Sequence, residues 1–319
     1  MFLAGSAVVA IVAAALLFTF VMVRRVEAAH PPRGEFASLA GGRMHFTQIL
    51  PPGEPRGVAL LVHGASGNES DLALPLGQRL ASRGFRVLAV DRPGHGWSDR
   101  LGAETPALQA ARIIDLLDSI GVREVIVVGH SLGGVTAASL VLSFPERIRG
   151  LVLVAPVTHP WPGGVALYYN VASAPVVGPL FCALFAMPLG LLTMEGALKS
   201  VFAPGSPPPD YARRTGLARV LRPKNFAANA RDVAGTFAFV TPQAARMKEI
   251  AAPTAIVTGD RDSIVFAHIH SLGSARDIAG ATLTFLPGVG HSPHWADPDA
   301  VVAAIESVAE RAGAEAGHP

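Results

Sequence analysis

The sequence predicts an α/β fold in which helices flank both faces of a mostly parallel sheet. Short, continuous apolar runs alternate with segments whose apolar residues recur at helical spacing, which is the pattern of parallel strands joined by helical crossovers. Half of the 319 residues are apolar and only 16% are charged, so the chain can bury a large core. Two features modify this architecture: an apolar segment at the N-terminus and a long insertion that interrupts the alternation.

The N-terminal segment predicts a transmembrane-type helix over residues 1–25. No charged residue occurs from Phe2 to Val23, and at roughly 1.5 Å per residue this stretch spans about 33 Å, enough to cross a bilayer core. Arg24 and Arg25 follow it, whereas a signal peptide carries its positive charge before a shorter apolar run. We expect an uncleaved membrane anchor that leaves the rest of the chain in the cytoplasm. The alternative is a signal peptide processed near residues 26–28, which would make the protein periplasmic or secreted.

After a linker at residues 26–35, the α/β core is expected over 36–157 and 249–319. A hairpin around Gly41 and Gly42 comes first, and buried strands and helices then alternate. The expected strands after the hairpin are 58–62, 85–90, 125–128, 151–154, 255–257 and 283–286, and the expected helices are 70–83, 106–120, 131–143, 265–279 and 297–312.

Residues 158–248 break the alternation and are rich in Pro, Gly and large apolar side chains, which predicts an inserted helical cap. An apolar stretch at 165–194 raises the alternative of a second membrane span. Pro175, Pro179 and Pro188 argue against a regular helix there, so we expect cap helices instead.

One pentapeptide predicts a nucleophile. Gly129-His130-Ser131-Leu132-Gly133 lies where an apolar strand gives way to a helix, and its glycines permit the sharp turn that exposes a serine hydroxyl. The backbone N–H groups at the start of the following helix favour a developing oxyanion. An ordinary Gly-Ser helix start is the alternative interpretation.

A serine nucleophile needs a base that removes its proton, and His291 is the candidate because it follows the last expected strand in a loop. His294, His268 and His270 are its local rivals. These histidines lack neighbouring carboxylates or cysteines at zinc-motif spacing, so no metal is expected.

The base in turn needs a carboxylate that fixes its tautomer, and either Asp260 or Asp262 meets this need after the strand at 255–257. The oxyanion donors are expected to be the N–H groups of Ala65, in the loop after the first buried strand, and Leu132. The order serine, aspartate, histidine is that of a strand-turn-helix nucleophile site.

These segments resemble the α/β-hydrolase superfamily, in its capped serine esterase or lipase-like branch. The resemblance rests on five stretches that follow one another in the family's order: residues 63–67, 91–98, 129–134, 259–262 and 290–298. It implies Asp262 as the acid, since the family's aspartate lies three residues after the glycine. It also argues against the epoxide hydrolases and dehalogenases of the superfamily, which use an aspartate where this chain has Ser131.

The expected activity is hydrolysis of a carboxylic ester through an acyl-enzyme on Ser131, with no cofactor. Trp161, Tyr168, Tyr169 and Phe181 predict a pocket for a lipophilic group, although they are equally expected as cap core. One alternative is C–C bond hydrolysis on the same triad, which requires a cap cation from among Arg213, Arg214, Arg219 and Arg222. A non-catalytic, membrane-tethered binding protein is the third hypothesis. A net charge of +2 without a basic stripe does not predict nucleic acid binding.

Overall fold

The computed structural model describes residues 2–102 and 104–316, and these residues form one eight-stranded sheet in the order β1-β2-β4-β3-β5-β6-β7-β8. The pairs β1/β2 and β2/β4 are antiparallel and the remaining pairs are parallel, which confirms the predicted mostly parallel sheet. The strands are β1 (Glu35–Leu39), β2 (Gly42–Ile49), β3 (Gly57–Val62), β4 (Phe85–Val90), β5 (Val125–His130), β6 (Ile148–Val154), β7 (Thr254–Gly259) and β8 (Thr282–Leu286).

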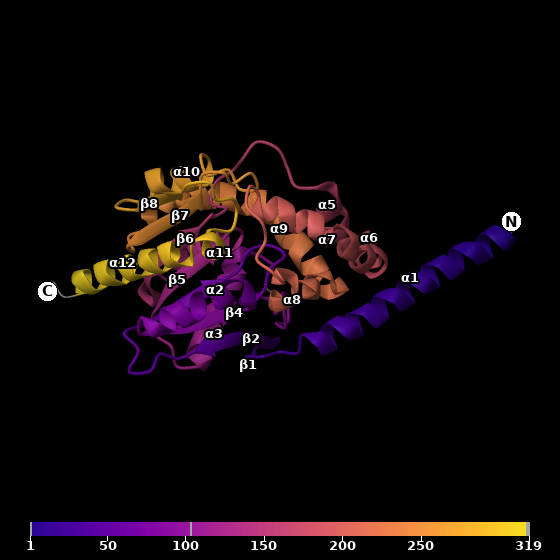
Figure 1. Cartoon of the computed structure of the whole chain (residues 1–319), viewed down its shortest axis with the longest axis horizontal. Coiled ribbons are helices and arrows are strands. Elements are labelled where there is room, and N and C mark those ends of the chain that lie inside the picture. Colours follow the sequence, from indigo (N-terminus) through magenta and orange to yellow (C-terminus); the bar gives the residue numbers. More distant parts are fainter. Residues whose placement is uncertain (1, 103, 317–319) are drawn as a thin grey trace.

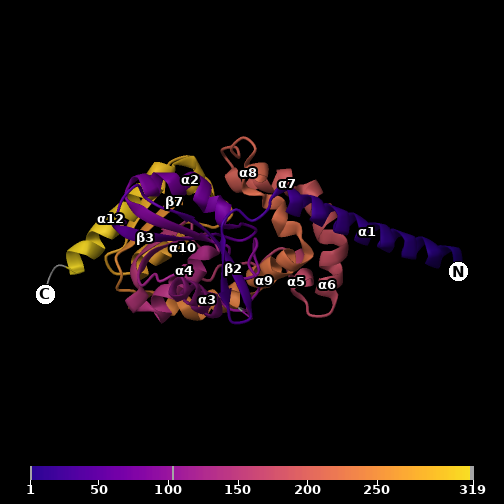
Figure 2. The same ribbon diagram turned by 90° about the horizontal axis from the view of Figure 1, so that it is seen from below.

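Helices cover both faces of this sheet (Figures 1 and 2). On one face, α2 (Glu69–Ser82) and α12 (Pro298–Ala316) pack against strand side chains such as Leu61 and Val152. On the other, α3 (Pro106–Ser119), α4 (Gly133–Ser143) and α10 (His270–Asp277) pack against side chains such as Leu60 and Val127. Strands buried on both faces explain the continuous apolar runs of the sequence. The helix expected over 265–279 is shorter than predicted, and α4 begins two residues after Ser131.

Residues 158–248 lie between β6 and β7, and we refer to them as the cap segment. Its helices gather beyond one end of the sheet in Figure 1. They are α5 (Leu167–Ser173), α6 (Val177–Phe181), the π-helical turn η2 (Cys182–Ala186), α7 (Met187–Phe202), α8 (Tyr211–Thr215), the short 3-10 helix η3 (Leu217–Leu221) and α9 (Pro223–Arg246), followed by the 3-10 turn η4 (Met247–Glu249).

No single regular helix covers 165–194, as expected, because the chain breaks between α5 and α6, where Pro175 lies, and is π-helical at η2. Pro179 and Pro188 interrupt less than expected, since α6, η2 and α7 form one helical run from Val177 to Phe202. Pro179 lies in the first turn, where a missing N–H leaves no intrahelical bond unmade. Pro188 directly follows the π-helical turn, whose wider backbone accommodates a residue that cannot donate. By length and composition, two described segments are long and apolar enough to cross a membrane: Ser6–Ala29 and Val177–Phe202.

The N-terminal helix α1 (Phe2–Ala29) continues four residues beyond the expected boundary at Arg25, which shortens the linker before β1. The extension is stabilised by packing, because Val26 is buried against Met187 and Leu221 of the cap segment. Glu27 also pairs with Arg222 at 3.3 Å. The C-terminal end of α1 is therefore part of the folded protein.

Candidate active site

Ser131 occupies a strained turn between β5 and α4. Its φ of +52° lies in the left-handed region, which costs an L residue about 1–2 kcal/mol and requires support from the surrounding chain. Gly133 supplies part of that support, since a Cβ there would lie 2.3 Å from the carbonyl oxygen of Val62. The close approach of α4 to β3 thus requires glycine, and the strand-turn-helix geometry is the one predicted for a nucleophile.

The structure brings Ser131, His291 and Asp262 together. His291 Nε2 lies 2.8 Å from Ser131 Oγ, and His291 Nδ1 lies 2.7 Å from Asp262 Oδ2. The three residues follow the carboxyl ends of β5, β8 and β7, respectively. All three are buried, with 5% to 8% of their surface exposed. A hydroxyl, an imidazole and a carboxylate linked in this order can move a proton from oxygen to nitrogen.

Asp262 is held as a carboxylate. Burial raises its pKa, but the hydrogen bond from His291 and the N–H groups of Val265 and Ile264, each 2.9 Å from Oδ1, more than offset this and lower the pKa below its ordinary value. Asp260, the alternative acid, accepts the N–H of Gly288 at 2.7 Å instead. Of the two aspartates, only Asp262 contacts His291.

The three other histidines considered as the base do not hydrogen-bond to Ser131. His270 is buried, and its Nδ1 accepts the backbone N–H groups of Thr158 and His159 at 3.3 and 3.2 Å. Burial lowers the pKa of His270 to about 4, which keeps its ring neutral. His268 is exposed beside Phe266. His294 faces Asp71, so His291 is the one of the four that bonds Ser131.

The predicted oxyanion donors lie on either side of Ser131. The loop after β3 approaches the serine so closely that a Cβ on Gly64 would lie 2.9 Å from Ser131 Cβ. Ala65 follows Gly64 and packs in the same apolar cluster as Leu132 at the start of α4. Ala65 and Leu132 therefore both lie near Ser131, and the role of their backbone N–H groups stays a prediction.

A buried arginine, whose role sequence reasoning missed, holds the loop after β3. Arg92 Nε donates to the carbonyl oxygen of His63 at 3.0 Å, and Nη2 donates to that of Gly64 at 3.2 Å. Its Nη1 pairs with Asp232 of α9 at 2.8 Å. The cap segment therefore supplies the counter-charge for the arginine that positions the Ala65 loop.

The four predicted pocket aromatics separate into two groups. Trp161 packs beside Leu132 and Ala65, next to the nucleophile. Tyr169 and Phe181 pack in an apolar cluster inside the cap segment, and Tyr168 stacks on Tyr169 with its ring half exposed. The position of Trp161 suits a substrate contact, and that of the other three suits packing within the cap.

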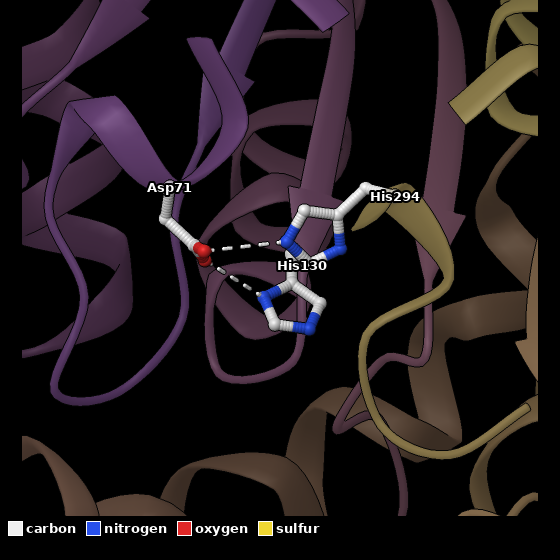
Figure 3. Close-up of side chains that lie close together, drawn as sticks. All are labelled: Asp71, His130 and His294. Carbon is white, nitrogen blue, oxygen red and sulfur yellow. Dashed lines mark ion pairs between the residues drawn. The ribbon is translucent and has the colours of Figure 1, made fainter. Parts of the chain in front are cut away.

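Behind the site lies a carboxylate that sequence reasoning missed (Figure 3). Asp71 of α2 is paired with His294 at 3.4 Å and with His130 at 3.6 Å. It also accepts the hydroxyl of Tyr211 from α8 at 2.7 Å and the indole N–H of Trp295 at 3.0 Å. A lone aspartate in an amphipathic helix carries no sequence signal of such burial.

This network reaches the candidate base. His130 Nε2 donates to the carbonyl oxygen of His291 at 3.0 Å, so Asp71 is connected through His130 to the loop that carries the base. Burial raises the pKa of Asp71, but His294 and His130 outweigh this and hold it well below its ordinary value. Burial lowers the pKa of His294 to about 4.

Two triplets of described residues have the spacing of metal ligands: Asp71, His130 and His294, and also His45, Glu69 and Asp91. The Asp71 oxygen nearest His294 already accepts two hydrogen bonds, from Tyr211 and Trp295. In the second triplet, His45 Nδ1 bonds Asp91 Oδ2 at 2.8 Å. We therefore interpret both as hydrogen-bonded networks that fix the loops around the site.

Replacing Asp71 with Asn is expected to lower the free energy of unfolding by about 2 kcal/mol at pH 7, because the buried hydrogen bonds from Tyr211 and Trp295 to a charged carboxylate become bonds to a neutral amide. The folded-state pKa of Asp71 is depressed, so its contribution is present above pH of about 4 and is lost as the pH falls through the folded-state pKa. Urea unfolding of the parent and the variant from pH 7 to pH 3 measures this contribution. The difference between their free energies of unfolding should become smaller in acid. Asp115→Asn, which breaks a half-exposed pair with Arg112, is the control and should cost less than about 1 kcal/mol. Equal losses for the two variants would contradict the buried network.

The fold and this geometry together define a hydrolase of the α/β class. Comparison with known proteins agrees: the sequence profile of the alpha/beta hydrolase family matches residues 59–304. The chain belongs to the alpha/beta hydrolase family, and the family together with its hydrolase relatives supports its assignment as a hydrolase.

Its relatives vary in what is known of them. An uncharacterized protein of Mycobacterium tuberculosis is 29% identical over 301 residues, which cover 89% of this chain and 83% of the relative. The 2-hydroxy-6-oxo-6-phenylhexa-2,4-dienoate hydrolase of Burkholderia cepacia is 28% identical over 251 residues, covering 76% and 83%. The crystal structure of a hydrolase from Pseudomonas aeruginosa PA01 aligns with a TM-score of 0.64 at 26% identity, covering 88% of this chain and 99% of that one.

Proposed function

We propose that this protein is a serine hydrolase that cleaves a carboxylic ester of a lipophilic small molecule. The observation that carries the proposal is the continuous chain from Ser131 Oγ to His291 Nε2 at 2.8 Å and from His291 Nδ1 to Asp262 Oδ2 at 2.7 Å. Its support is chemical, since each member meets the need of the next: a hydroxyl, a base and an ionised orienting group.

The reaction proceeds in two acyl-transfer steps. Ser131 Oγ attacks the ester carbonyl carbon while His291 Nε2 takes the hydroxyl proton, and the tetrahedral oxyanion accepts the N–H groups of Ala65 and Leu132. Collapse expels the alcohol, which receives the proton from His291. Water then attacks the acyl-enzyme with His291 again as base, and the carboxylic acid leaves.

A lipophilic substrate is favoured by the surroundings of Ser131. Leu132, Val135 and Val265 form an apolar cluster beside it, with Trp161 at its edge. An enzyme held at a membrane by α1 meets such substrates at high local concentration. We place the hydrolase domain on the cytoplasmic side, where Arg24 and Arg25 would remain.

C–C bond hydrolysis is the second candidate, and a relative favours it: the Burkholderia cepacia protein is named as a dienoate hydrolase. The same three residues serve that reaction. The cap cations required for a substrate carboxylate are engaged otherwise in this structure: Arg213 pairs with Asp210, Arg219 with Glu69, Arg222 with Glu27, and Arg214 lies over the ring of Trp295. Because these arginines already have partners, ester hydrolysis is favoured over C–C bond hydrolysis. The complete proton relay argues against a non-catalytic binding protein.

A series of p-nitrophenyl esters from acetyl to dodecanoyl tests the proposal. The value of kcat/KM is expected to rise with acyl length, by up to about fourfold for each methylene that enters an apolar pocket. A dienoate C–C substrate measured beside the series should be turned over far more slowly. Turnover of the dienoate with none of the esters would replace the proposal by the second candidate.

A further inference from the structure

The cap segment has a long stretch without charge. Residues 160–194 contain no Asp, Glu, Lys, Arg or His. Six of the large apolar side chains in this stretch, which we call the cap ridge, are 49% to 87% exposed: Leu167, Val176, Val177, Leu180, Leu189 and Leu192. Large apolar side chains gathered in one uncharged segment and left this exposed are typical of a surface that contacts a partner or a membrane.

Helix α7, which bears Leu189 and Leu192 of the cap ridge, packs against the helix that would anchor the protein. Met22, Val23 and Val26 of α1 contact the cap segment in one apolar cluster with Met187 and Leu191. Both views show α1 projecting past α6, away from the sheet (Figures 1 and 2). The cap ridge and the exposed part of α1 therefore belong to one end of the molecule.

The distance by which the cap segment packs along α1 beyond Arg24 gives the depth to which it would enter a bilayer. The Arg24 and Arg25 charges mark the expected level of the lipid headgroups. Thr19 is only 5% exposed although Phe18 and Phe20 are largely exposed, so packing against α1 extends five residues beyond Arg24 toward the apolar end. At roughly 1.5 Å per residue this is about 8 Å, the depth to which interfacial helices enter a bilayer.

The apolar run Val177–Phe202 lies in the interface without crossing the bilayer. Its C-terminal end is joined to the site, because Val201 accepts the backbone N–H of His291 at 3.2 Å and Phe202 packs against Tyr211. Its N-terminal end is held as well, because Ala172 of the preceding α5 packs in one cluster with Ala227 and Ala230 of α9. A helical run with both ends fixed on the same side of one folded domain does not span the membrane, whereas α1 is fixed at its C-terminal end. The run leads instead from the cap ridge to the loop that carries the base.

We propose that the cap ridge is a second membrane-contacting surface, which inserts into the leaflet that α1 enters and delivers lipid-dissolved substrate to Ser131 directly from the bilayer. The occupant of this surface is the acyl-chain region of a phospholipid bilayer. The delivery of substrate rests on the ester hydrolase proposed above, whereas the insertion does not. Two experiments keep the two parts separate.

The first experiment measures insertion in the full-length protein reconstituted into phosphatidylcholine and phosphatidylglycerol vesicles. The lone cysteine is removed by Cys182→Ala, and single cysteines at Leu180 or Leu192 carry an environment-sensitive fluorophore. Leu17 in α1 is the membrane reference, and Phe285 in β8, which is 41% exposed, is the matched control on the core. Lipids with nitroxide on the acyl chain should quench the Leu17, Leu180 and Leu192 labels, and aqueous iodide should quench only the Phe285 label.

Iodide quenching of the ridge labels as strong as that of Phe285 would overturn the proposal. Ridge labels shielded from both quenchers would also overturn it, since a second copy or another protein would then cover the ridge. Quenching of Leu17 by iodide would overturn it as well, because α1 would not enter the bilayer. None of these results depends on ester turnover.

The second experiment measures delivery with the double variant Leu180→Glu/Leu192→Glu. Turnover of a water-soluble butyryl ester should be unchanged, whereas turnover of a long-chain ester dissolved in vesicles should fall by about tenfold. Phe285→Glu should change neither rate. Equal rates on the vesicle substrate for the double variant and the parent would overturn delivery through the ridge, whereas a parent inactive on all esters would instead refute the hydrolase proposal.

Discussion

Ser131→Ala is expected to lower kcat for ester hydrolysis by about 10⁴-fold or more, because no other hydroxyl takes its place in the relay to His291. At about 1.36 kcal/mol per tenfold change, this is a loss of at least about 5.4 kcal/mol of transition-state stabilisation. KM should change little, since the hydroxyl forms its bond only during reaction. Steady-state rates with p-nitrophenyl butyrate, above the uncatalysed rate, measure the loss.

The fold should survive this substitution, because alanine at a φ of +52° has a strain similar to that of serine and the buried glycines beside it are unchanged. Thermal unfolding checks this. Ser82→Ala, at an exposed helix position where the hydroxyl donates to Gln78, is the matched control and should keep full activity. A fluorophosphonate probe should label the parent and the control but not the Ser131 variant. Retention of more than a tenth of the activity would rule out an acyl-enzyme on Ser131.

Much of this site could be predicted because the end of a short apolar run in the sequence marks the end of a strand. The apolar runs that became β5 and β7 are buried along their whole length, so they stand out from one chain without further information, whereas β8 is a mostly exposed edge strand that the run Leu283 to Leu286 still marked. Side chains that follow such runs meet at one edge of a parallel sheet. Ser131 and His291 were therefore expected near each other although they are 160 residues apart.

The supporting residues could not be predicted, because they act through tertiary contacts. Arg92 and Asp232 pair across 140 residues, and nothing local distinguishes them from surface charges. Asp71 lies on α2 among residues typical of a solvated helix face, yet it is buried by Tyr211 and Trp295. Burial of a charge depends on which partners arrive from distant elements, and that information is not in the local pattern.

In the cap segment and α1, local sequence preferences were given more weight than they have in the folded protein. The prolines of the cap segment were given their usual weight as helix breakers, but a π-helical turn before Pro188 absorbs the missing hydrogen bond. Likewise, α1 was expected to end near Arg25, and it continues because Val26 gains a buried contact with Met187. In both places tertiary packing outweighs the local preference on which the prediction depended.

The residues alone left Asp260 and Asp262 as equal candidates for the acid, and their variants are expected to differ by about three orders of magnitude or more. Asp262→Asn should lower kcat by about 10⁴-fold at pH 7. The amide can donate to His291 Nδ1, which favours the tautomer with its proton on Nε2, and that nitrogen can then no longer accept the proton of Ser131. Because interactions in the folded protein lower the pKa of Asp262, the parent carboxylate stays ionised throughout the working range.

Asp260→Asn is the matched control, since its Oδ1 only accepts the N–H of Gly288 and an asparagine oxygen accepts the same bond. Its kcat should stay within about threefold of the parent value, because at most one exposed hydrogen bond is weakened. Rates from pH 5 to pH 9 with one soluble ester compare the three proteins. If Asp260→Asn loses as much activity as Asp262→Asn, the loop after β7 acts as a unit and the orienting role cannot belong to Asp262 alone. If only Asp262→Asn loses activity, the contact of 2.7 Å with His291 is the one that fixes the base in its reactive tautomer.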